Sequence, residues 1–350
     1  MSKSDVKQAV ILGASGYTGA ECVRLIANHP RLEIAALTGH SRAGQAYGDV
    51  YPNFAHMDLP TLCTVDEVNW DAVDVAFACL PHGASQETIA KIYDKVETVI
   101  DLSADFRLSD AQLYADTYGR PHEFAELLAG RVYGLTEFAR KDLKDAKLVA
   151  CPGCYPTASL LALLPAIEGG LLAGAPVIID AKSGVTGTGR KTAQALHYSE
   201  VTDGAHAYAI GNHRHTPEIE QGLKAHGGAD VAVSFTPHLI PMNRGMIATC
   251  YVELAKGVSV ETLRAAYVKR YADEPFVQIM AQGTVPQTRH IKASNNCQIG
   301  VFADRVSGRA IIVSVIDNLT KGSSGQAIQN YNAMQGWDET LGLMTPPVFP

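Results

Sequence analysis

The chain lacks an excess of positive charge. Its 29 lysines and arginines stand against 36 aspartates and glutamates, which gives a net charge of -7 at pH 7. Nucleic acids and anionic membranes are bound through clustered cations, so this balance argues against both classes of partner. Only 19% of the 350 residues are charged and 7% aromatic, whereas 47% are hydrophobic. We therefore expect a folded chain that is long enough for two domains.

Long apolar runs and paired cysteines are also scarce. The most apolar stretch, residues 160–179, contains Pro165, Glu168 and Pro176 and is a poor membrane span. The first residues lack the apolar core of a signal peptide. The seven cysteines have no disulfide-like spacing. We expect a reducing, cytoplasmic setting and no membrane partner.

The stretch around Cys154 organises the rest of the chain. Residues 148–150 read as a strand end, Pro152-Gly153 as a turn, and residues 157–164 as a buried helix. A thiolate at the entry of a helix is stabilised by free N–H groups and by the helix dipole, which makes it a better nucleophile. We predict that Cys154 attacks an activated carbonyl. The alternatives are a buried structural cysteine and a redox or zinc pair with Cys151.

A glycine-rich turn follows the first expected strand. Residues 8–12 form a short apolar run and residues 20–27 have helical spacing, with Gly13, Gly16 and Gly19 between them. A strand, a glycine turn and a helix provide the context of a dinucleotide-phosphate site, although the spacing departs from G-x-G-x-x-G. A purely structural turn is the alternative. The expected cofactor contacts are Gly13, Ser15, Gly16, Tyr17, Thr18 and Gly19.

The residues that follow the second expected strand, 32–37, indicate which dinucleotide the chain binds. An NAD site usually has a carboxylate near the end of this strand to bind the ribose 2′-hydroxyl. Here Ser41 and Arg42 follow instead. A hydroxyl and a guanidinium suit a 2′-phosphate, so we expect NADP(H); an ordinary surface charge is the alternative for Arg42.

Arg107 lies just beyond another expected strand, residues 98–102. A planar guanidinium there suits bidentate binding of phosphate or carboxylate, and we assign Arg107 to the substrate. An ion pair with Asp105 is equally consistent with the sequence.

The second half of the chain contains two further loops with site candidates. Residues 183–191 form a glycine-rich loop after a strand, and such loops often approach a ligand closely. We assign Ser183 to the substrate and Gly184 to the cofactor. Arg244, in the loop 237–245 between two strands, is also assigned to the substrate.

Two histidines precede a helix whose N-cap we expect at Thr216. A thiol that acts on an acyl group needs an acid/base of near-neutral pKa, and histidine is the usual choice. His213 and His215 are both candidates. We favour His215, although the sequence does not distinguish them.

The order of expected elements predicts an α/β fold with two domains. The first half alternates strands and helices, as in a Rossmann-type NADP-binding domain. From residue 231 the chain turns to long strands, which predicts an α+β domain with a mostly antiparallel sheet. We expect residues 1–150 plus about 320–350 in the first domain and 151–319 in the catalytic and oligomerisation domain. One sheet face would then make a subunit interface.

Seven motifs, in order, resemble the N-acetyl-gamma-glutamyl-phosphate reductases, of the aspartate-semialdehyde dehydrogenase-like superfamily. The resemblance extends over nearly the whole chain. The motifs are the glycine turn 13–19, Leu102–Arg107, Cys151–Thr157, Lys182–Arg190, His213–Glu218, Pro237–Gly245 and Asn318–Gly322.

This resemblance implies an NADPH-dependent enzyme of arginine biosynthesis, usually a dimer or tetramer. It would reduce N-acetyl-gamma-glutamyl phosphate to the semialdehyde and phosphate through a thioester on Cys154. It also implies that Arg107 contacts the substrate phosphate and that Asn318 and Lys321 lie near the nicotinamide. The same chemistry on an aminoadipyl or aspartyl phosphate is the nearest alternative. A non-catalytic NADP-sensing regulator is an alternative of another class, and a thiol oxidoreductase would need Cys151 as the resolving thiol.

Overall fold

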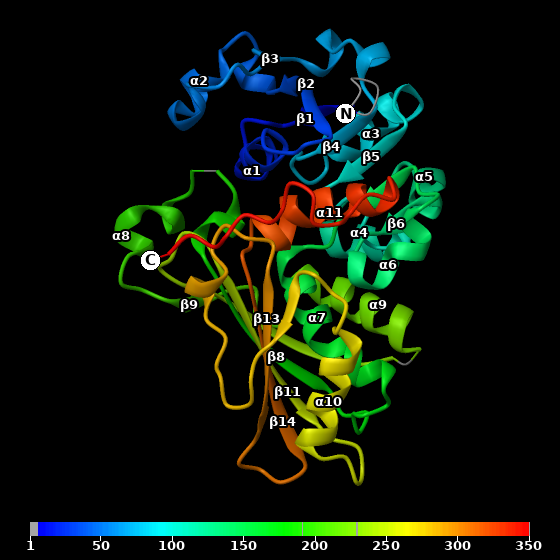
Figure 1. Ribbon diagram of the computed structural model, residues 1–350, viewed down its shortest axis with the longest axis vertical. Helices are drawn as coiled ribbons and strands as arrows, with labels where there is room; N and C mark the ends of the chain where they lie inside the picture. Colours follow the sequence, from blue (N-terminus) through cyan, green and yellow to red (C-terminus); the bar gives the residue numbers. More distant parts are fainter. Residues whose placement is uncertain (1–5, 191, 229, 350) are drawn as a thin grey trace. The chain divides into compact units, whose positions relative to one another are not determined.

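The chain forms two compact units in the computed structural model, which describes residues 6–190, 192–228 and 230–349 (Figure 1). The first unit consists of the residues up to Pro152 together with Ser323–Met344. The second consists of Gly153–Gly322 and the residues from Thr345 onward. Residue 191, at the end of the expected glycine-rich loop, lies outside the described residues.

The first unit is built on a seven-stranded sheet in the order β3-β2-β1-β4-β5-β7-β6. All six neighbouring pairs are parallel. The strand order reverses between β1 and β4, and in open α/β sheets this switch point is where ligands bind, beyond the carboxyl ends of the strands. The strands are β1 (Lys7–Leu12), β2 (Leu32–Thr38), β3 (Leu62–Cys63), β4 (Val75–Ala78), β5 (Thr98–Asp101), β6 (Val132–Tyr133) and β7 (Leu148–Ala150).

The helices of the first unit include one from the far end of the chain. This helix, α11 (Gly325–Met334), packs against α6, α1 and β5 of the same unit. Its polar residues Gln326, Gln329 and Asn330 are fully buried and bind partners on α6 or just before it. The other helices are α1 (Tyr17–Ile26), α2 (Tyr47–Val50), α3 (Ser85–Ile92), α4 (Ala111–Tyr118), α5 (Ala125–Gly130) and α6 (Thr136–Leu143).

The end of the chain does not stay with α11, contrary to the expected assignment of about 320–350 to the first domain. Residues from Thr345 onward belong to the second unit. The N–H of Val348 donates to the carbonyl oxygen of Lys292 at 2.9 Å, and the Arg289 guanidinium lies 4.8 Å from the Phe349 ring. No periodic pattern in the sequence marks this short return.

The second unit has a seven-stranded mixed sheet in the order β12-β13-β14-β11-β8-β10-β9. Four of its six pairs are antiparallel, and the pairs β8–β10 and β12–β13 are parallel. Its strands are β8 (Val177–Ser183), β9 (His206–Ala207), β10 (Val233–Leu239), β11 (Met246–Glu253), β12 (Val277–Ile279), β13 (Cys297–Ala303) and β14 (Arg309–Ile316).

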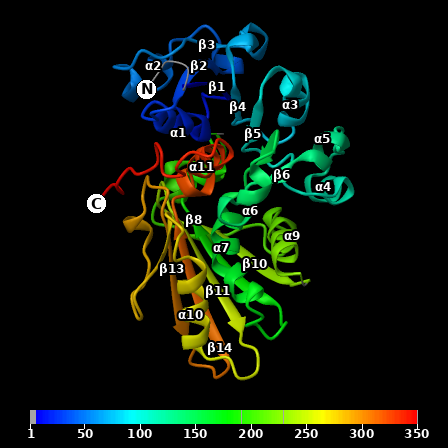
Figure 2. The same ribbon diagram turned by 45° about the vertical axis from the view of Figure 1, so that its right-hand side comes forward.

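Helices cover one face of this sheet (Figure 2). At their centre is α7 (Cys154–Glu168), which is buried from Tyr155 to Ala166 because it packs against β11, β14 and two helices. That burial explains why the helix is apolar on all sides. The neighbouring helices are α9 (His215–Gly227) and α10 (Val260–Arg270), and a short helix, α8 (Tyr198–Val201), lies in a loop.

Candidate active site

The glycine turn after β1 is as tight as a phosphate cradle requires. Gly13 has a φ of +73°, and a Cβ there would lie 2.5 Å from the Cys79 carbonyl oxygen. A Cβ on Gly19 would lie 2.5 Å from the Gly13 carbonyl oxygen. Gly16 donates its N–H to Gly13 and is the N-cap of α1, so the turn leads directly into a helix N-terminus. Backbone N–H groups placed in this way suit a phosphate.

Two tyrosines and a threonine that the sequence did not single out hold this turn. The hydroxyl of Tyr47 donates to the Ala14 carbonyl at 3.0 Å, and that of Tyr51 donates to the Ser15 carbonyl at 2.9 Å. The Thr38 hydroxyl accepts from the Gly13 N–H at 3.1 Å. The two tyrosines thereby fix the carbonyl groups of Ala14 and Ser15. The side chains of Ser15, Tyr17 and Thr18 are partly exposed at the turn.

Ser41 and Arg42 lie in a 3₁₀ turn, His40–Arg42, just after β2. Both side chains are exposed, and Arg42 donates weakly to Gln45 at 3.4 Å. Since β1 and β2 are adjacent parallel strands, this turn and the glycine turn lie at the same edge of the sheet. An exposed guanidinium and a hydroxyl at this edge match the expected 2′-phosphate site.

Arg107 is 6% exposed and binds main-chain carbonyls. Its Nε donates to Cys151 at 2.8 Å and its Nη2 donates to Leu102 at 2.9 Å. Arg131 supports the same turn by donating to the Phe106 carbonyl at 3.1 Å. These contacts position the segment that leads to Cys154, and the assignment of Arg107 to the substrate phosphate stays a prediction.

Cys154 is the first residue of α7 and is partly exposed. The preceding residue, Gly153, is the N-cap in an extended conformation, and the first turn contains no acidic residue. The Thr157 hydroxyl donates to the Gly153 carbonyl at 3.0 Å, which braces the turn. The thiol therefore lies at the positive end of a buried helix dipole, where a thiolate is favoured.

Cys151, the other cysteine of the C-x-x-C pattern, has a different environment. It is 1% exposed and burial raises the pKa of its thiol well above the usual value. Asn330 donates to its Sγ at 3.6 Å. All seven cysteines are free, and the described residues contain no cluster of three or more His, Cys, Asp or Glu side chains suited to a metal. A sealed, protonated thiol is a poor resolving partner.

His213 braces the start of α9. Its Nδ1 accepts the His215 N–H at 3.1 Å. Burial, aided by the nearby charge of Arg214, lowers the pKa of His213 to about 4. The imidazole is therefore neutral at physiological pH and has its proton on Nε2. The helix begins at His215, one residue before the expected N-cap Thr216, and the His213 ring accepts the N–H of that first residue.

His215 faces a carboxylate. Its Nε2 lies 4.0 Å from Oε2 of Glu218, whose side chain is 1% exposed. The other oxygen of Glu218, Oε1, accepts the N–H of Gly153 at 2.8 Å. Glu218 thus joins the start of the Cys154 helix to the His215 imidazole, and these three groups form one cluster within the second unit.

Aromatic rings line this cluster. The Tyr155 ring lies 5.7 Å from His213 and 5.9 Å from His215, centre to centre. Its hydroxyl donates to the His238 carbonyl at 3.3 Å and accepts from the Tyr208 hydroxyl at 3.2 Å. Burial raises the pKa of Tyr208 to about 12, so both phenols stay neutral and act only as hydrogen-bonding groups.

The other predicted residues of the second unit meet at one end of its sheet. Ser183 ends β8 and pairs with Met246, which in turn pairs with Ile316, so these three residues lie at the same end of the sheet. Arg244 precedes Met246, and Asn318 follows Ile316. The backbones approach closely here, since a Cβ on Gly184 would lie 2.7 Å from the Asn243 carbonyl oxygen.

Asn318 and Lys321 lie in the turn that follows β14. Asn318 accepts the Gly245 N–H at 2.8 Å and donates to the Thr186 hydroxyl at 2.9 Å. Lys321 is fully buried, with its Nζ 5.9 Å from the Phe276 ring centre. The next residue, Gly322, packs against Cys154: a Cβ there would lie 2.8 Å from the Cβ of Cys154.

Two family models together match most of the chain. The semialdehyde dehydrogenase NAD binding domain matches residues 8–146, and the semialdehyde dehydrogenase dimerisation domain matches residues 154–318. N-acetyl-gamma-glutamyl-phosphate reductase from Rhodospirillum rubrum is 50% identical over 99% of this chain and 100% of its own length. The chain belongs to the N-acetyl-gamma-glutamyl-phosphate reductase family.

Further relatives agree with membership of this reductase family. The probable chloroplastic N-acetyl-gamma-glutamyl-phosphate reductase of Arabidopsis thaliana is 50% identical over 97% of this chain and 84% of its own length. Among solved structures, aspartate semialdehyde dehydrogenase II from Vibrio cholerae has a TM-score of 0.72 at 15% identity, covering 95% of this chain and 98% of that one. The latter likeness concerns the fold.

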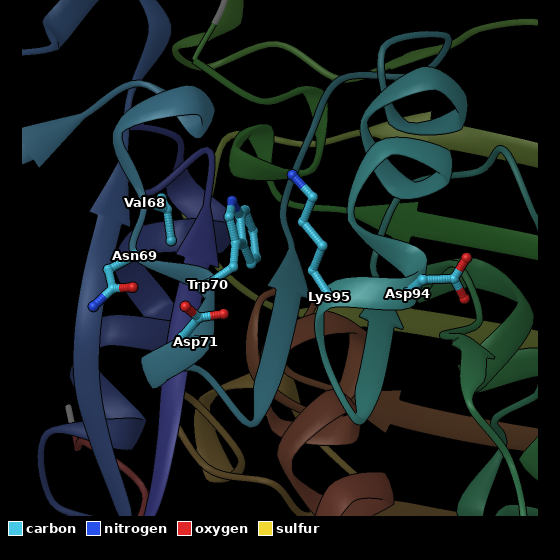
Figure 3. Close-up of a pocket in the computed structure, with 6 residues that line it drawn as sticks. All are labelled: Val68, Asn69, Trp70, Asp71, Asp94 and Lys95. Atoms are coloured by element: carbon cyan, nitrogen blue, oxygen red, sulfur yellow. The ribbon is translucent and has the colours of Figure 1, made fainter.

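A depression of about 470 Å³ in the first unit is lined by none of the residues predicted for the reductase site. Its lining, shown in Figure 3, comes from the segments that precede β4 and β5, at the amino ends of those strands. The glycine turn follows the carboxyl end of β1, so the depression lies at the opposite edge of the sheet.

In the described part of the chain, no helix is both long and apolar enough to cross a membrane.

Glu218 is the main site residue that sequence reasoning missed. Its i,i+3 spacing from His215 is a weak local indication, but nothing in the sequence indicates a bond to Gly153, which is 65 positions away. Tyr47 and Tyr51 give no indication of the glycine turn either, because their i,i+4 spacing is also typical of an ordinary helix face.

Proposed function

We propose that this protein catalyses the NADPH-dependent reduction of N-acetyl-gamma-glutamyl phosphate to N-acetyl-glutamate semialdehyde and phosphate, a step of arginine biosynthesis. The reductase relatives, which match the chain from end to end, supply the substrate class. The observation that carries the chemistry is that the Glu218 carboxylate binds the start of α7, where Cys154 is the first residue, and faces the His215 ring. The first unit would bind the cofactor, and the second would carry the reaction.

The residues of the first unit fit NADP(H). The glycine turn leaves no room for a Cβ at Gly13 or Gly19, and its N–H groups lead into α1. Beside it, the exposed Ser41 and Arg42 suit a 2′-phosphate, where an NAD site would need a carboxylate. When bound, the cofactor supplies the hydride. The assignments of Gly184, Asn318 and Lys321 to the nicotinamide side remain part of this proposal.

Cys154 would act as the nucleophile. Its thiolate attacks the acyl carbon, a carbon–sulfur bond forms, and the carbon–oxygen bond to phosphate breaks. The N–H groups at the start of α7 are positioned to stabilise the oxyanion, an effect worth about 3–4 kcal/mol per donor where it has been measured. The resulting thioester keeps the acyl group in place for reduction. We assign the departing phosphate to Arg107, with Ser183 and Arg244 binding other parts of the substrate.

His215 would manage the proton. Glu218 faces Nε2 of His215, and we assign the other ring nitrogen, Nδ1, to proton exchange with the thiol and later with the hemithioacetal oxygen. When the ring is protonated, the buried Glu218 carboxylate stabilises its charge. Collapse of the hemithioacetal releases the semialdehyde and restores the thiolate. His213, with a pKa of about 4, is unsuited to this role near neutral pH.

The alternatives differ in what they require of these residues. A non-catalytic NADP sensor would need the glycine turn but has no use for a thiol, an imidazole and a carboxylate gathered at a helix start. A thiol oxidoreductase would need Cys151, whose thiol is buried and has a raised pKa. Aspartyl and aminoadipyl phosphates would use the same cluster, so the substrate assignment relies on the relatives.

Phosphate-dependent reduction of NADP⁺ tests the proposal in the reverse direction. N-acetyl-glutamate semialdehyde should be oxidised at least 100-fold more efficiently, in kcat/KM, than aspartate semialdehyde or aminoadipate semialdehyde. Cys154→Ala should abolish turnover while NADPH still binds with unchanged affinity. Turnover of the variant, or a preference for another semialdehyde, would refute the nucleophile or the substrate.

We propose further that the protein is a homo-oligomer that assembles through the open face of the second sheet. A row of side chains crosses this face in register, since Tyr251 pairs with both Ile178 and Ile311, and Ile311 pairs with Phe302. These four are exposed or partly exposed, whereas alternate residues of the same strands pack under α7. The matching dimerisation-domain model supports a second copy as the occupant.

A further inference from the structure

Asp317 is the most heavily bonded carboxylate of the second unit's site region. It follows β14 directly and is fully buried. Five donors reach its two oxygens at distances of 2.6–3.0 Å: Nε and Nη2 of Arg244 and the N–H groups of Ala293, Leu319 and Thr320. A buried carboxylate with this many donors is fixed in position and orientation by its hydrogen bonds.

The bonds from Asp317 set the orientation of the Arg244 guanidinium. The two groups form a bidentate pair, with Nε to Oδ2 at 2.9 Å and Nη2 to Oδ1 at 3.0 Å. Nη2 also donates to the Thr320 hydroxyl at 2.9 Å. The bidentate pair fixes the plane of the fork, and the Arg244 side chain is still 18% exposed.

The same residue builds the turn that covers the nucleophile. The Asp317 carboxylate accepts from Leu319 and Thr320, and its main-chain carbonyl accepts the Gly322 N–H at 2.9 Å. The chain there is a π-helix, Thr320–Ser324, a rare element that is frequent at functional sites. At its centre, Gly322 packs so closely on Cys154 that a Cβ would lie 2.8 Å from the cysteine Cβ.

Backbone strain occurs at the same carboxylate. Ala293 has a φ of +61°, a conformation that is strained for any residue with a Cβ. This conformation directs its N–H to Asp317 Oδ2 at 2.6 Å. Strain of this kind persists where the surrounding structure enforces it, and here the charge-assisted bond to Asp317 does so.

We propose that Asp317 is a positioning residue that orients Arg244 toward the substrate and sets Gly322 against Cys154. Asp317 itself touches neither the substrate nor the thiol. It fixes two groups that do: a guanidinium for an anionic part of the acyl phosphate, and the backbone that shapes access to the sulfur. The part that concerns Arg244 rests on the proposed function, whereas the part that concerns Cys154 is independent of it.

Asp317→Asn tests both parts, since it keeps the shape of the side chain and removes its charge. The KM for N-acetyl-gamma-glutamyl phosphate should rise at least tenfold, with the KM for NADPH within twofold. Alkylation of Cys154 by iodoacetamide, followed at that residue by peptide mass spectrometry, should become at least threefold faster. The matched control is Asp304→Asn, which breaks another Asp–Arg pair, with Arg309, on the hairpin between β13 and β14; both readouts should stay unchanged.

An unchanged KM for the acyl phosphate, or an unchanged alkylation rate at Cys154, would overturn the proposal even if Asp317→Asn lowers the melting temperature. Should Asp317→Asn fail to fold, Thr320→Val removes one acceptor of Arg244 without changing side-chain shape. It should raise the same KM at least threefold, and an effect below twofold would also overturn the proposal. If the wild-type protein does not reduce the acyl phosphate, the proposed function fails, and the alkylation rates still decide the position of Gly322.

Discussion

At the scale of single residues, the structure separates two histidines that the sequence presents as equivalents. His213 accepts a backbone N–H and has a pKa of about 4, because it is buried beside Arg214. His215 faces the carboxylate of Glu218. The physical difference is the surroundings: burial, aided by the charge of Arg214, opposes protonation of the His213 ring, whereas the His215 ring has a carboxylate as its neighbour.

Replacement of each histidine by Asn should separate catalyst from scaffold. His215→Asn removes the acid/base and should lower kcat by about 10²–10⁴, the usual range for such a group. His213→Asn keeps an acceptor for the His215 N–H and should retain kcat within about tenfold. The measurement is steady-state turnover, with NADPH affinity as the control for folding. Equal losses in both variants would mean that His215 has no special role.

His213 should also make the free energy of unfolding depend on pH. Its pKa is about 4 in the folded chain and about 6.5 when unfolded, so between these values the unfolded chain binds a proton that the folded chain does not. The contribution of His213 to the free energy of unfolding is fully present above pH 6.5. It decreases as the pH falls toward 4, by about 1–3 kcal/mol in total.

Melting temperatures of the wild type and His213→Asn between pH 7 and pH 5 test this dependence. The gap between the two proteins should narrow as the pH falls, because only the wild type loses stability through this ring. Asp101 acts in the opposite sense: burial raises its pKa to about 6, so acid relieves a buried charge. The Asp101 contribution is the same in both proteins and cancels in the comparison. A difference in melting temperature that does not change with pH would contradict the assigned pKa of His213.

At the scale of elements, the glycine turn between β1 and α1 makes the sharpest demand on the backbone. Gly13→Ala should weaken NADPH binding at least tenfold, because φ is +73° and the new Cβ would lie 2.5 Å from the Cys79 carbonyl oxygen. The turn must then move, and its N–H groups move with it. Equilibrium titration of nucleotide fluorescence measures the effect.

Gly119→Ala is the matched control for this substitution. Gly119 has nearly the same φ, +69°, at the end of α4, but nothing lies within 4 Å of an added Cβ. It should cost about 1 kcal/mol of stability from the backbone alone and leave NADPH binding unchanged. A similar loss of affinity in both variants would mean that backbone strain, and not the shape of the turn, governs binding.

The boundaries of elements show where local patterns stop being informative. The turn at Pro152-Gly153 predicts a helix close by, but α7 begins at Cys154 itself and α9 begins at His215. Both starts are completed from outside the helix, by Glu218 for the first and by the His213 ring for the second. A helix start that is capped by a side chain distant in sequence, or by a residue type that rarely caps helices, cannot be predicted from the local sequence.

At the scale of the whole molecule, the proposed oligomer interface on the open face of the second sheet can be tested directly. Ile178→Asp places a charge on this face and should shift the protein from oligomer to monomer in sedimentation at micromolar concentration, because the charge would be buried between copies. Val268→Asp on α10 is the matched control, since both side chains are 44% exposed. Dissociation of both variants, or of neither, would contradict the proposed interface.

The candidate site was predictable where its residues are neighbours in sequence. The glycine turn, Cys154 at a helix start and the two histidines each lie in a short segment whose pattern has a physical meaning. Tyr47, Glu218 and the contacts of Arg107 were not predictable in this way. Each acts through a hydrogen bond to a backbone group at least 33 positions away, and only packing brings such groups together.

The sequence by itself determined the parallel first sheet, the second α+β unit and the position of a thiol at a helix start, because period, turn residues and strand order act locally. The tertiary structure alone decided the partner of each imidazole, the return of residues 345–349 to the second unit, and the hydrogen bonds of Arg244 and Gly322 to Asp317. The physical reason is that burial and charge proximity change with every distant contact. A pKa or a fixed guanidinium is therefore a property of the folded chain rather than of any segment.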